Sequence, residues 1–282
     1  MNNRQFGQSG AVVSAIGQGS WQFPGSKNAL EETKKALRYG VELGMTHIDT
    51  AEMYDDAELV IAEAIKGLAR EELFLVSKVL PSNASYEGTL SACEKSLKRL
   101  GVDYLDCYLL HWRGKYPLEQ TMSALEKLVD DGKIKSLGVS NFDMADLKEA
   151  ESKLKKHKIV CNQVLYNVYE RGIERNLIPY CQKKEIAVVG YTPFGLRKPP
   201  ATNSKQGAVL DSICQKHAAT PRQIMLSFLI REELLFTIPK AAQSAHTKEN
   251  ADAIRIKLDS ADIERINEAF PAPDRDVPLA MV

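Results

Sequence analysis

Three polar side chains that can carry charge or move a proton end short apolar runs in the first half of the chain. Asp49 ends one run, Lys78 ends the next and His111 ends a third, and Tyr54 follows Asp49 closely. A carboxylate, an ammonium, an imidazole and a phenol perturb one another's pKa values when a fold brings them together. The chemistry that this set favours is proton transfer to or from a bound substrate.

The phenol of Tyr54 is the candidate proton donor. A tyrosine has an ordinary pKa of about 10, so alone it is a poor acid at neutral pH. We expect Lys78 to favour the tyrosinate and so lower this pKa, while Asp49 holds the buried ammonium by a charge-assisted hydrogen bond. His111 can hydrogen-bond the substrate oxygen and share the negative charge that develops there.

Polar residues also end the later apolar runs, and each has an ordinary structural explanation. Strand ends need polar side chains near exposed backbone groups, so one such residue alone indicates only a strand boundary. Several such residues together are more informative about a site, because the carboxyl ends of all strands in a parallel barrel meet on one rim and bring these side chains together. The later candidates are Ser140, Asn141, Asn162, Gln163, Tyr191 and Lys240.

Short runs of valine, isoleucine and leucine alternate with longer segments of helical period, which is typical of repeated βα units. About eight such runs predict an α/β fold, a closed (β/α)8 TIM barrel, with residues 1–282 forming one domain. The runs cover residues 13–17, 45–48, 73–76, 104–110, 134–139, 160–165, 187–191 and 236–238.

Amphipathic segments between the runs predict the helices. Apolar residues recur at three- and four-residue spacing in 31–43, 85–100, 118–131 and 174–184. Thr220, Pro221 and Gln223 read as an N-cap, a first-turn proline and a capping-box glutamine for a helix over 224–230. Because 209–217 is also helical in pattern, an extra helix precedes the last strand.

The two ends of the chain depart from the βα repeat. Residues 4–13 contain the turn signal Gly7-Gln8-Ser9-Gly10 and predict an N-terminal β-hairpin that caps one end of the barrel. Pro271, Pro273 and Pro278 predict an irregular C-terminal tail after the extra helices.

Composition and charge narrow the class of partner. Lysine plus arginine equals aspartate plus glutamate at 37 each, so no net charge attracts nucleic acid or an anionic membrane. No run approaches the roughly 18 apolar residues of a membrane helix, and residues 1–20 lack a signal-peptide pattern. Five cysteines without a CxxC pair indicate reduced thiols in a cytoplasmic protein, and five histidines without ligand spacing predict no metal.

The same residues carry a resemblance to the aldo-keto reductase family that runs over nearly the whole chain. It implies a catalytic tetrad of Asp49, Tyr54, Lys78 and His111 and the reduction of a small aldehyde or ketone. The matching segments are Gly17-Gln18-Gly19-Ser20-Trp21, His47-Ile48-Asp49-Thr50-Ala51-Glu52-Met53-Tyr54, Ser77-Lys78-Val79, Leu105-Asp106-Cys107-Tyr108-Leu109-Leu110-His111-Trp112, and Gly132-Lys133-Ile134-Lys135-Ser136-Leu137-Gly138-Val139-Ser140-Asn141-Phe142.

The resemblance also implies a nicotinamide cofactor. Tyr191 would stack on the nicotinamide ring, although a core aromatic is the rival explanation for this residue. His246 stands where many relatives have an arginine that clamps the 2′-phosphate, which implies a weaker clamp. Lys240 can still contribute a positive charge, so NADPH is favoured with NADH possible. The implied cofactor-binding residues are Gly19, Ser20, Asp49, Ser140, Asn141, Gln163, Tyr191, Pro239, Lys240, His246, Glu249 and Asn250.

Substrate contacts are expected from Trp21 and Trp112 as apolar walls, together with Tyr54 and His111 at the carbonyl oxygen. Met53 and Tyr86 are further wall candidates. Asp55 stands where the family usually has glycine, a departure that touches the substrate pocket more than the tetrad. The family default for the oligomeric state is a monomer.

Two other functions fit parts of the pattern. A barrel lyase or aldolase would use Lys78 as a Schiff-base nucleophile. A cofactor-sensing homologue would keep the barrel and bind the cofactor without useful turnover. A Rossmann dinucleotide site is disfavoured, because Gly17-Gln18-Gly19 has no third glycine in register.

Overall fold

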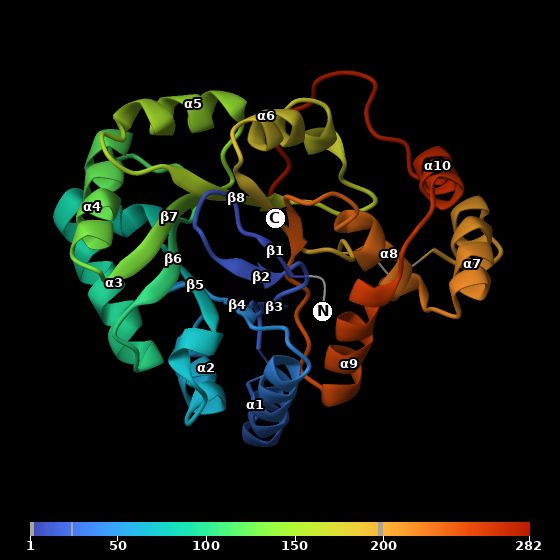
Figure 1. The fold of residues 1–282 in the computed structure, drawn as a ribbon, viewed down its shortest axis with the longest axis horizontal. Helices are drawn as coiled ribbons and strands as arrows, with labels where there is room; N and C mark the ends of the chain where they lie inside the picture. Colours follow the sequence, from blue (N-terminus) through green and yellow to red (C-terminus); the bar gives the residue numbers. More distant parts are fainter. Residues whose placement is uncertain (1–2, 24, 197–199) are drawn as a thin grey trace.

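The computed structural model describes residues 3–23, 25–196 and 200–282. Its centre is an eight-stranded parallel sheet in the order β10-β9-β8-β7-β6-β5-β4-β3, which curls into a barrel ringed by helices (Figure 1). The strands are β3 (Gln18–Gly19), β4 (His47–Asp49), β5 (Phe74–Val79), β6 (Leu105–Leu110), β7 (Ile134–Ser140), β8 (Ile159–Leu165), β9 (Ala187–Tyr191) and β10 (Leu235–Thr237).

Single β-bridges close the barrel between its first and last strands. Ile16 bridges Thr237 and Gly19 bridges Lys240, both in parallel sense. The backbone N–H of Gly17 donates to the carbonyl of Thr237 over 2.8 Å. Every strand is then paired on both sides. Because all eight strands are parallel, their carboxyl ends lie at the same rim of the barrel.

Helices cover the outer face of the sheet, as the alternating pattern predicts. The apolar stripe of each amphipathic helix packs against the apolar outer side chains of the strands, which builds the main core. The helices are α1 (Lys27–Glu42), α2 (Ala57–Ile65), α3 (Tyr86–Leu100), α4 (Leu118–Asp130), α5 (Met144–Lys153), α6 (Leu177–Lys183), α7 (Lys205–His217), α8 (Pro221–Leu229), α9 (Ser244–Asp252) and α10 (Ser260–Ala269).

The predicted fold class is confirmed, and seven of the predicted runs overlap barrel strands. The prediction that residues 13–17 form the first barrel strand is confirmed only for the second half of that run. Val12–Ser14 (β2) pairs with Asn3–Gln5 (β1) in the N-terminal hairpin, whereas Ala15 to Gly17 pair with Thr237 of β10 and lead into β3 in the barrel wall. An apolar run predicts burial, but it does not indicate whether the buried strand belongs to the N-terminal hairpin or to the barrel wall.

The hairpin closes the amino ends of the strands. Phe6 lies between the strands of the hairpin and packs its ring against His47, Phe74 and Phe236, with centroid distances of 5.6, 4.7 and 5.1 Å. Gly7 has φ of +53°, and a Cβ there would lie 2.1 Å from the carbonyl oxygen of Val160. The close approach therefore requires glycine, and in Figure 1 β1 and β2 cross the centre of the barrel.

Two helices, α7 and α8, lie between β9 and β10, which confirms the predicted extra helix. The capping box at Thr220 is present: its side chain accepts from Gln223 N, and Gln223 reaches back to Thr220 N over 3.0 Å. After α10, residues 271–282 form no helix or strand, as the prolines predict. No helix in the described part of the chain has the length and apolarity that crossing a bilayer requires.

Candidate active site

A cavity of about 490 Å³ opens at the carboxyl ends of the strands, where the sequence predicts the site. Most of its lining comes from the loops that follow β3, β4, β6, β7, β9 and β10. The lining residues are Gly19, Ser20, Trp21, Gln22, Asp49, Met53, Tyr54, His111, Trp112, Ser140, Asn141, Gln163, Tyr191, Thr192, Pro193, Phe194, Gly195, Ile238, Lys240, Met281 and Val282.

Lys78 lies beneath the cavity floor with no exposed surface, and Asp49 beside it is 2% exposed. The ammonium donates to Asp49 Oδ1 over 2.6 Å and to the carbonyl of Thr50 over 2.7 Å. Burial alone would lower the pKa of Lys78, but Asp49 and Tyr54 together raise it by more than burial lowers it. The net pKa of Lys78 therefore lies above its ordinary value. Lys78 is therefore an ammonium at neutral pH, without the free lone pair that a Schiff-base nucleophile needs.

Tyr54 lies in the loop between β4 and α2, where its ring faces Lys78. The ammonium nitrogen is 4.9 Å from the centre of the ring, and the phenol oxygen is 3.5 Å from His111 Nε2. Burial raises the pKa of Tyr54, and the charge of Lys78 lowers it by less, so the net pKa is above 10.0. The expectation of a phenol made more acidic overall is thus not met here, because the site removes the phenolate from water.

His111 is a neutral imidazole in this site. Burial, with a smaller contribution from the charge of Lys78, lowers the pKa of His111 to about 3. Its ring lies 5.6 Å from that of Tyr54 and 4.7 Å from that of Trp112. A neutral imidazole can donate one N–H···O hydrogen bond, which fits the expected role of His111 in orienting a substrate carbonyl.

Ser140, Asn141, Gln163 and Tyr191 form one connected polar wall across β7, β8 and β9. Gln163 donates its amide to Asp49 Oδ2 over 2.7 Å, and Ser140 Oγ donates to the carbonyl of Gln163 over 2.9 Å. Tyr191 donates its hydroxyl to Asn141 Oδ1 over 2.7 Å. Asn141 also has φ of +59° and donates Nδ2 to the carbonyl of His111 over 3.1 Å, so its amide is fixed at the rim.

The residues at this wall fit a nicotinamide cofactor. Ser20 Oγ is buried at the cavity and hydrogen-bonds no other described residue, which leaves a polar atom free for a ligand. Tyr191 presents a half-buried aromatic ring to the same space. An aromatic face, fixed amides and an unsatisfied hydroxyl suit a planar ring that carries a carboxamide.

The residues expected at the adenosine end lie further out. Lys240 lines the cavity edge and is exposed, while His246 is exposed in the first turn of α9. Glu249 already accepts from Thr220 Oγ1 over 2.5 Å, and Asn250 is buried. Pro239, His246, Glu249 and Asn250 are not among the residues that line the cavity in the described chain.

The expected apolar walls are only partly where the sequence places them. Trp21, Met53 and Trp112 line the cavity, whereas Tyr86 begins α3 and is not among the lining residues of the described chain. Asp55 has φ of +42°, which explains why glycine suits this position. Met281 and Val282 were missed, because nothing in a proline-rich tail indicates that its end returns to the site.

Glu52 is another residue whose role the sequence did not predict. Its carboxylate accepts from Leu80 N over 2.5 Å and from Asn83 Nδ2 over 3.1 Å. These bonds join the loop that carries Tyr54 to the segment that follows Lys78. A charged residue two positions before the predicted proton donor is the signal that could have indicated this role.

Fold and site together define a (β/α)8 barrel enzyme whose cavity opens at the carboxyl rim of the strands. A model described as the Aldo/keto reductase family matches residues 15–270. The chain belongs to the aldo/keto reductase family. The family predicted from the sequence is therefore confirmed.

Relatives cover almost the full length of the chain. Methylglyoxal reductase YeaE of Escherichia coli strain K12 is 42% identical over 272 residues, 96% of this chain and 95% of that protein. Glyoxal reductase of Bacillus subtilis strain 168 is 36% identical over 264 residues, 92% of this chain and 89% of that protein. A crystal structure of an aldo-keto reductase from Klebsiella pneumoniae in complex with NADPH is 39% identical, covers both chains fully and superposes with a TM-score of 0.93.

Proposed function

We propose that Tyr54 is the proton donor for an NADPH-dependent reduction of small aldehydes or ketones, with Lys78, Asp49 and His111 as its partners. The reaction class is that of the aldo/keto reductase family to which the chain belongs. The observation that carries the assignment is geometric: the phenol oxygen lies 3.5 Å from a neutral His111 at the floor of the cavity. Lys78 faces the same phenol as a permanent, buried cation.

The charge state of each of the four side chains determines its role in the reaction. NADPH, when bound, supplies a hydride to the carbonyl carbon. His111 donates an N–H···O hydrogen bond to the carbonyl oxygen and so positions this oxygen beside the phenol of Tyr54. Tyr54 holds a proton at neutral pH because its pKa lies above 10.0, and it gives that proton to the oxygen as an alkoxide, a much stronger base, forms there.

The tyrosinate that remains is stabilised by Lys78, whose positive charge is kept in place by Asp49. The raised resting pKa and the favourable ion pair are compatible. Burial penalises the phenolate before reaction, and the nearby ammonium limits that penalty when the proton leaves.

The cofactor would be held along one side of the cavity. Ser140, Asn141 and Gln163 suit its carboxamide, Tyr191 its nicotinamide ring, and Gly19 and Ser20 its adjoining part. Pro239 and Lys240, with His246, Glu249 and Asn250 of α9, would hold the adenosine half. The exposed ammonium of Lys240 supports NADPH over NADH, because it can neutralise a 2′-phosphate.

Small 2-oxoaldehydes are the substrate class that we favour. One relative is a methylglyoxal reductase and another a glyoxal reductase by name. In this chain Trp21, Trp112 and Met53 line the cavity around Tyr54, which supports a compact carbonyl compound between apolar walls.

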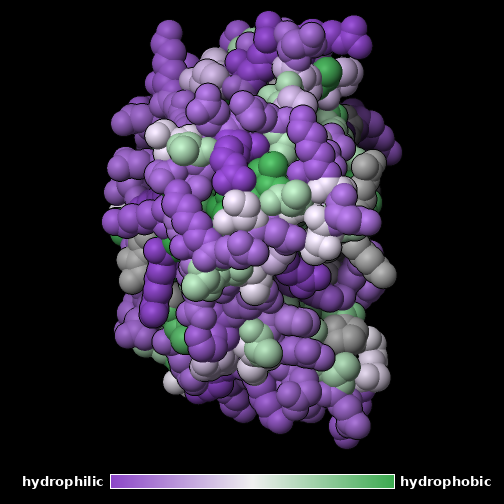
Figure 2. Space-filling view, turned by 90° about the vertical axis from the view of Figure 1, so that its right-hand side faces the viewer, coloured by the Kyte–Doolittle hydropathy of each residue, from purple (hydrophilic) through white to green (hydrophobic). Residues whose placement is uncertain are grey.

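We further infer a single barrel domain over residues 1–282, a monomer and a cytoplasmic location. The face that carries α7 and α10 is largely hydrophilic, with apolar side chains in small separate groups (Figure 2). Such a face favours a monomer over a large hydrophobic interface. Five free, buried cysteines suit a reducing compartment.

The test is to follow NADPH and NADH absorbance with the purified protein against glyoxal, methylglyoxal and a series of longer aldehydes and ketones. We expect NADPH oxidation that is fastest with the small 2-oxoaldehydes. Tight NADPH binding without oxidation of any substrate would favour a cofactor sensor instead. Borohydride trapping of substrate on Lys78 without nicotinamide would favour the lyase, against which the buried ammonium of Lys78 already argues.

A further inference from the structure

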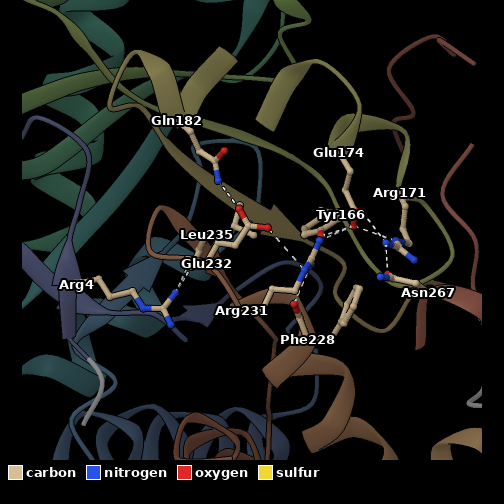
Figure 3. Close-up of polar contacts among 10 residues, drawn as sticks. All are labelled: Arg4, Tyr166, Arg171, Glu174, Gln182, Phe228, Arg231, Glu232, Leu235 and Asn267. Carbon is tan, nitrogen blue, oxygen red and sulfur yellow. Dashed lines mark hydrogen bonds and ion pairs between the residues drawn. The ribbon is translucent and has the colours of Figure 1, made fainter. Parts of the chain in front are cut away.

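A largely buried polar cluster lies behind the wall formed by Ser140, Asn141, Gln163 and Tyr191, on the outer side of β8 and β9. We call Tyr166, Arg171, Glu174 and Arg231 the Tyr166 cluster (Figure 3). Tyr166 donates its hydroxyl to Glu174 Oε1 over 2.6 Å and accepts from a guanidinium nitrogen of Arg231 over 2.7 Å. The phenol oxygen is therefore fixed from two sides.

The partners of Tyr166 are themselves fixed. Arg171 donates to both oxygens of Glu174, over 2.9 and 2.6 Å, and also to Asn267 Oδ1 over 2.7 Å. Although burial alone would raise the pKa of Glu174, the two arginines and the Tyr166 hydroxyl hold it below its ordinary value. Arg231 further stacks 4.1 Å from the ring of Phe228. Figure 3 shows these groups converging from separate segments of the chain, so the position of the phenol is set by the whole barrel.

The ring of Tyr166 packs directly against the backbone of β9. A Cβ placed on Gly190 would lie 3.2 Å from Tyr166 Cβ and 3.4 Å from Cδ1, so glycine leaves the space that the ring fills. Tyr166 N also donates to the carbonyl of Tyr191 over 3.4 Å. The side chain thus supports the outer face of the strand one residue before Tyr191, whose own ring faces the cavity.

We propose that Tyr166 is a positioning residue for the nicotinamide side of the site, acting through Gly190 on Tyr191. This inference rests on the proposed function, since it assumes that Tyr191 contacts the nicotinamide. Asn141 fixes the hydroxyl of Tyr191, while Tyr166 packs its ring against Gly190, the residue before Tyr191, and donates its backbone N–H to the Tyr191 carbonyl. With both ends held, Tyr191 presents its ring without having to be ordered when cofactor binds, which lowers the entropic cost of binding.

The test compares two ligands that differ only in the nicotinamide end: NADPH and 2′-phospho-ADP-ribose. In Tyr166→Phe the ring stays but loses its bonds to Glu174 and Arg231. We expect the Kd for NADPH to rise about 3- to 10-fold, the equivalent of one hydrogen bond. The Kd for 2′-phospho-ADP-ribose should not change, and the effect in turnover should appear in the KM for NADPH.

Tyr180→Phe is the matched control, because its hydroxyl also bonds a glutamate, Glu151, but lies on α6 away from the cavity. We expect both of its Kd values to equal those of the unaltered protein. Gly190→Ala approaches the same contact from the other side, and its added methyl should produce the same nicotinamide-selective loss.

Equal losses for the two ligands, or a lower melting temperature with both Kd values unchanged, would show that the Tyr166 cluster is only structural and would overturn the inference. If the unaltered protein bound 2′-phospho-ADP-ribose and NADPH with equal affinity, Tyr191 would not contact the nicotinamide and the inference would also fail. Absence of any NADPH binding by the unaltered protein would instead refute the proposed function on which the inference rests.

Discussion

Lys78 Nζ lies 2.6 Å from Asp49 Oδ1, where Lys78 has no exposed surface and Asp49 is 2% exposed. A buried ion pair gains little over an apolar pair of the same shape, but a buried charge left alone is costly. The pair is therefore poor evidence for stability and good evidence for a site that needs a permanent cation.

Replacing Asp49 by asparagine should lower the free energy of unfolding by about 3–5 kcal/mol, because it leaves the Lys78 ammonium buried without its counter-charge. Urea denaturation at neutral pH measures the change. Glu32→Gln is the control, since it breaks an exposed pair with Lys35 and should leave the denaturation midpoint where it was. An equally small effect of both substitutions would mean that Lys78 is neutral in the folded protein.

Tyr54→Phe should lower kcat by about 100- to 10,000-fold, because it removes the proton donor while keeping the ring. NADPH binding, followed by quenching of protein fluorescence, should be retained. His111→Asn is the comparison that separates orientation from proton donation, since an amide can still donate to the carbonyl oxygen. Turnover by Tyr54→Phe close to that of the unaltered protein would show that another group supplies the proton.

His47 predicts how stability depends on pH. Its ring is fully buried against Phe6 and Phe74, and neither ring nitrogen hydrogen-bonds a described residue. Burial lowers the pKa of His47 to about 4 from the ordinary 6.5. Between these values the unfolded chain binds a proton that the folded chain does not, so stability is full above pH 6.5 and falls as the pH drops to about 4.

The loss attributable to His47 is about 3 kcal/mol, from 1.36 kcal/mol for each pKa unit. His111, with its pKa of about 3, adds to the same trend. Denaturant titrations at several pH values measure the slope. In His47→Leu the slope between pH 6.5 and 4 should shrink, whereas His246→Gln, which changes an exposed histidine, should keep it. An unchanged slope in His47→Leu would refute the assignment.

We expect catalysis to depend on the hydrogen bonds by which Glu52 connects the loop that carries Tyr54 to the segment after β5. Glu52→Ala removes the acceptor for Leu80 N and Asn83, so the loop that carries Tyr54 should lose its fixed position and kcat should fall about tenfold, the equivalent of one charge-assisted hydrogen bond. Glu52→Gln keeps an acceptor oxygen and should restore most of the rate. Glu71→Ala, an exposed acid at the other end of β5, should have the kcat of the unaltered protein. Equal rates in Glu52→Ala and Glu52→Gln would contradict the positioning role.

Lys240 predicts the choice between cofactors. Lys240→Met removes the cation next to the proposed 2′-phosphate site, so the Kd for NADPH should rise about tenfold while that for NADH stays the same. Lys248→Met is a matched control on α9, where Lys248 pairs with Asp252 instead. Equal losses of NADPH and NADH affinity would place Lys240 against a part of the cofactor that both share.

Local patterns in the sequence determined the order of strands and helices and the identity of the candidate side chains. The runs that became β5 to β9 could be predicted because a parallel strand buried on both faces must be apolar along its length. The capping box at Thr220 could be predicted because it involves only four consecutive residues. Asp49, Lys78 and His111 could be predicted because each ends such a run, and a barrel brings those ends to one rim.

Only the tertiary structure decided what depends on distances between segments far apart in the sequence. It placed Val13 and Ser14 in the hairpin outside the barrel wall, brought Met281 and Val282 to the cavity, and set Tyr166 behind Gly190. It also decided the net pKa of Tyr54, because the penalty of burial depends on how many groups from the whole chain exclude water from the phenol. Residue type fixes which interactions are possible, and the three-dimensional packing fixes their strength.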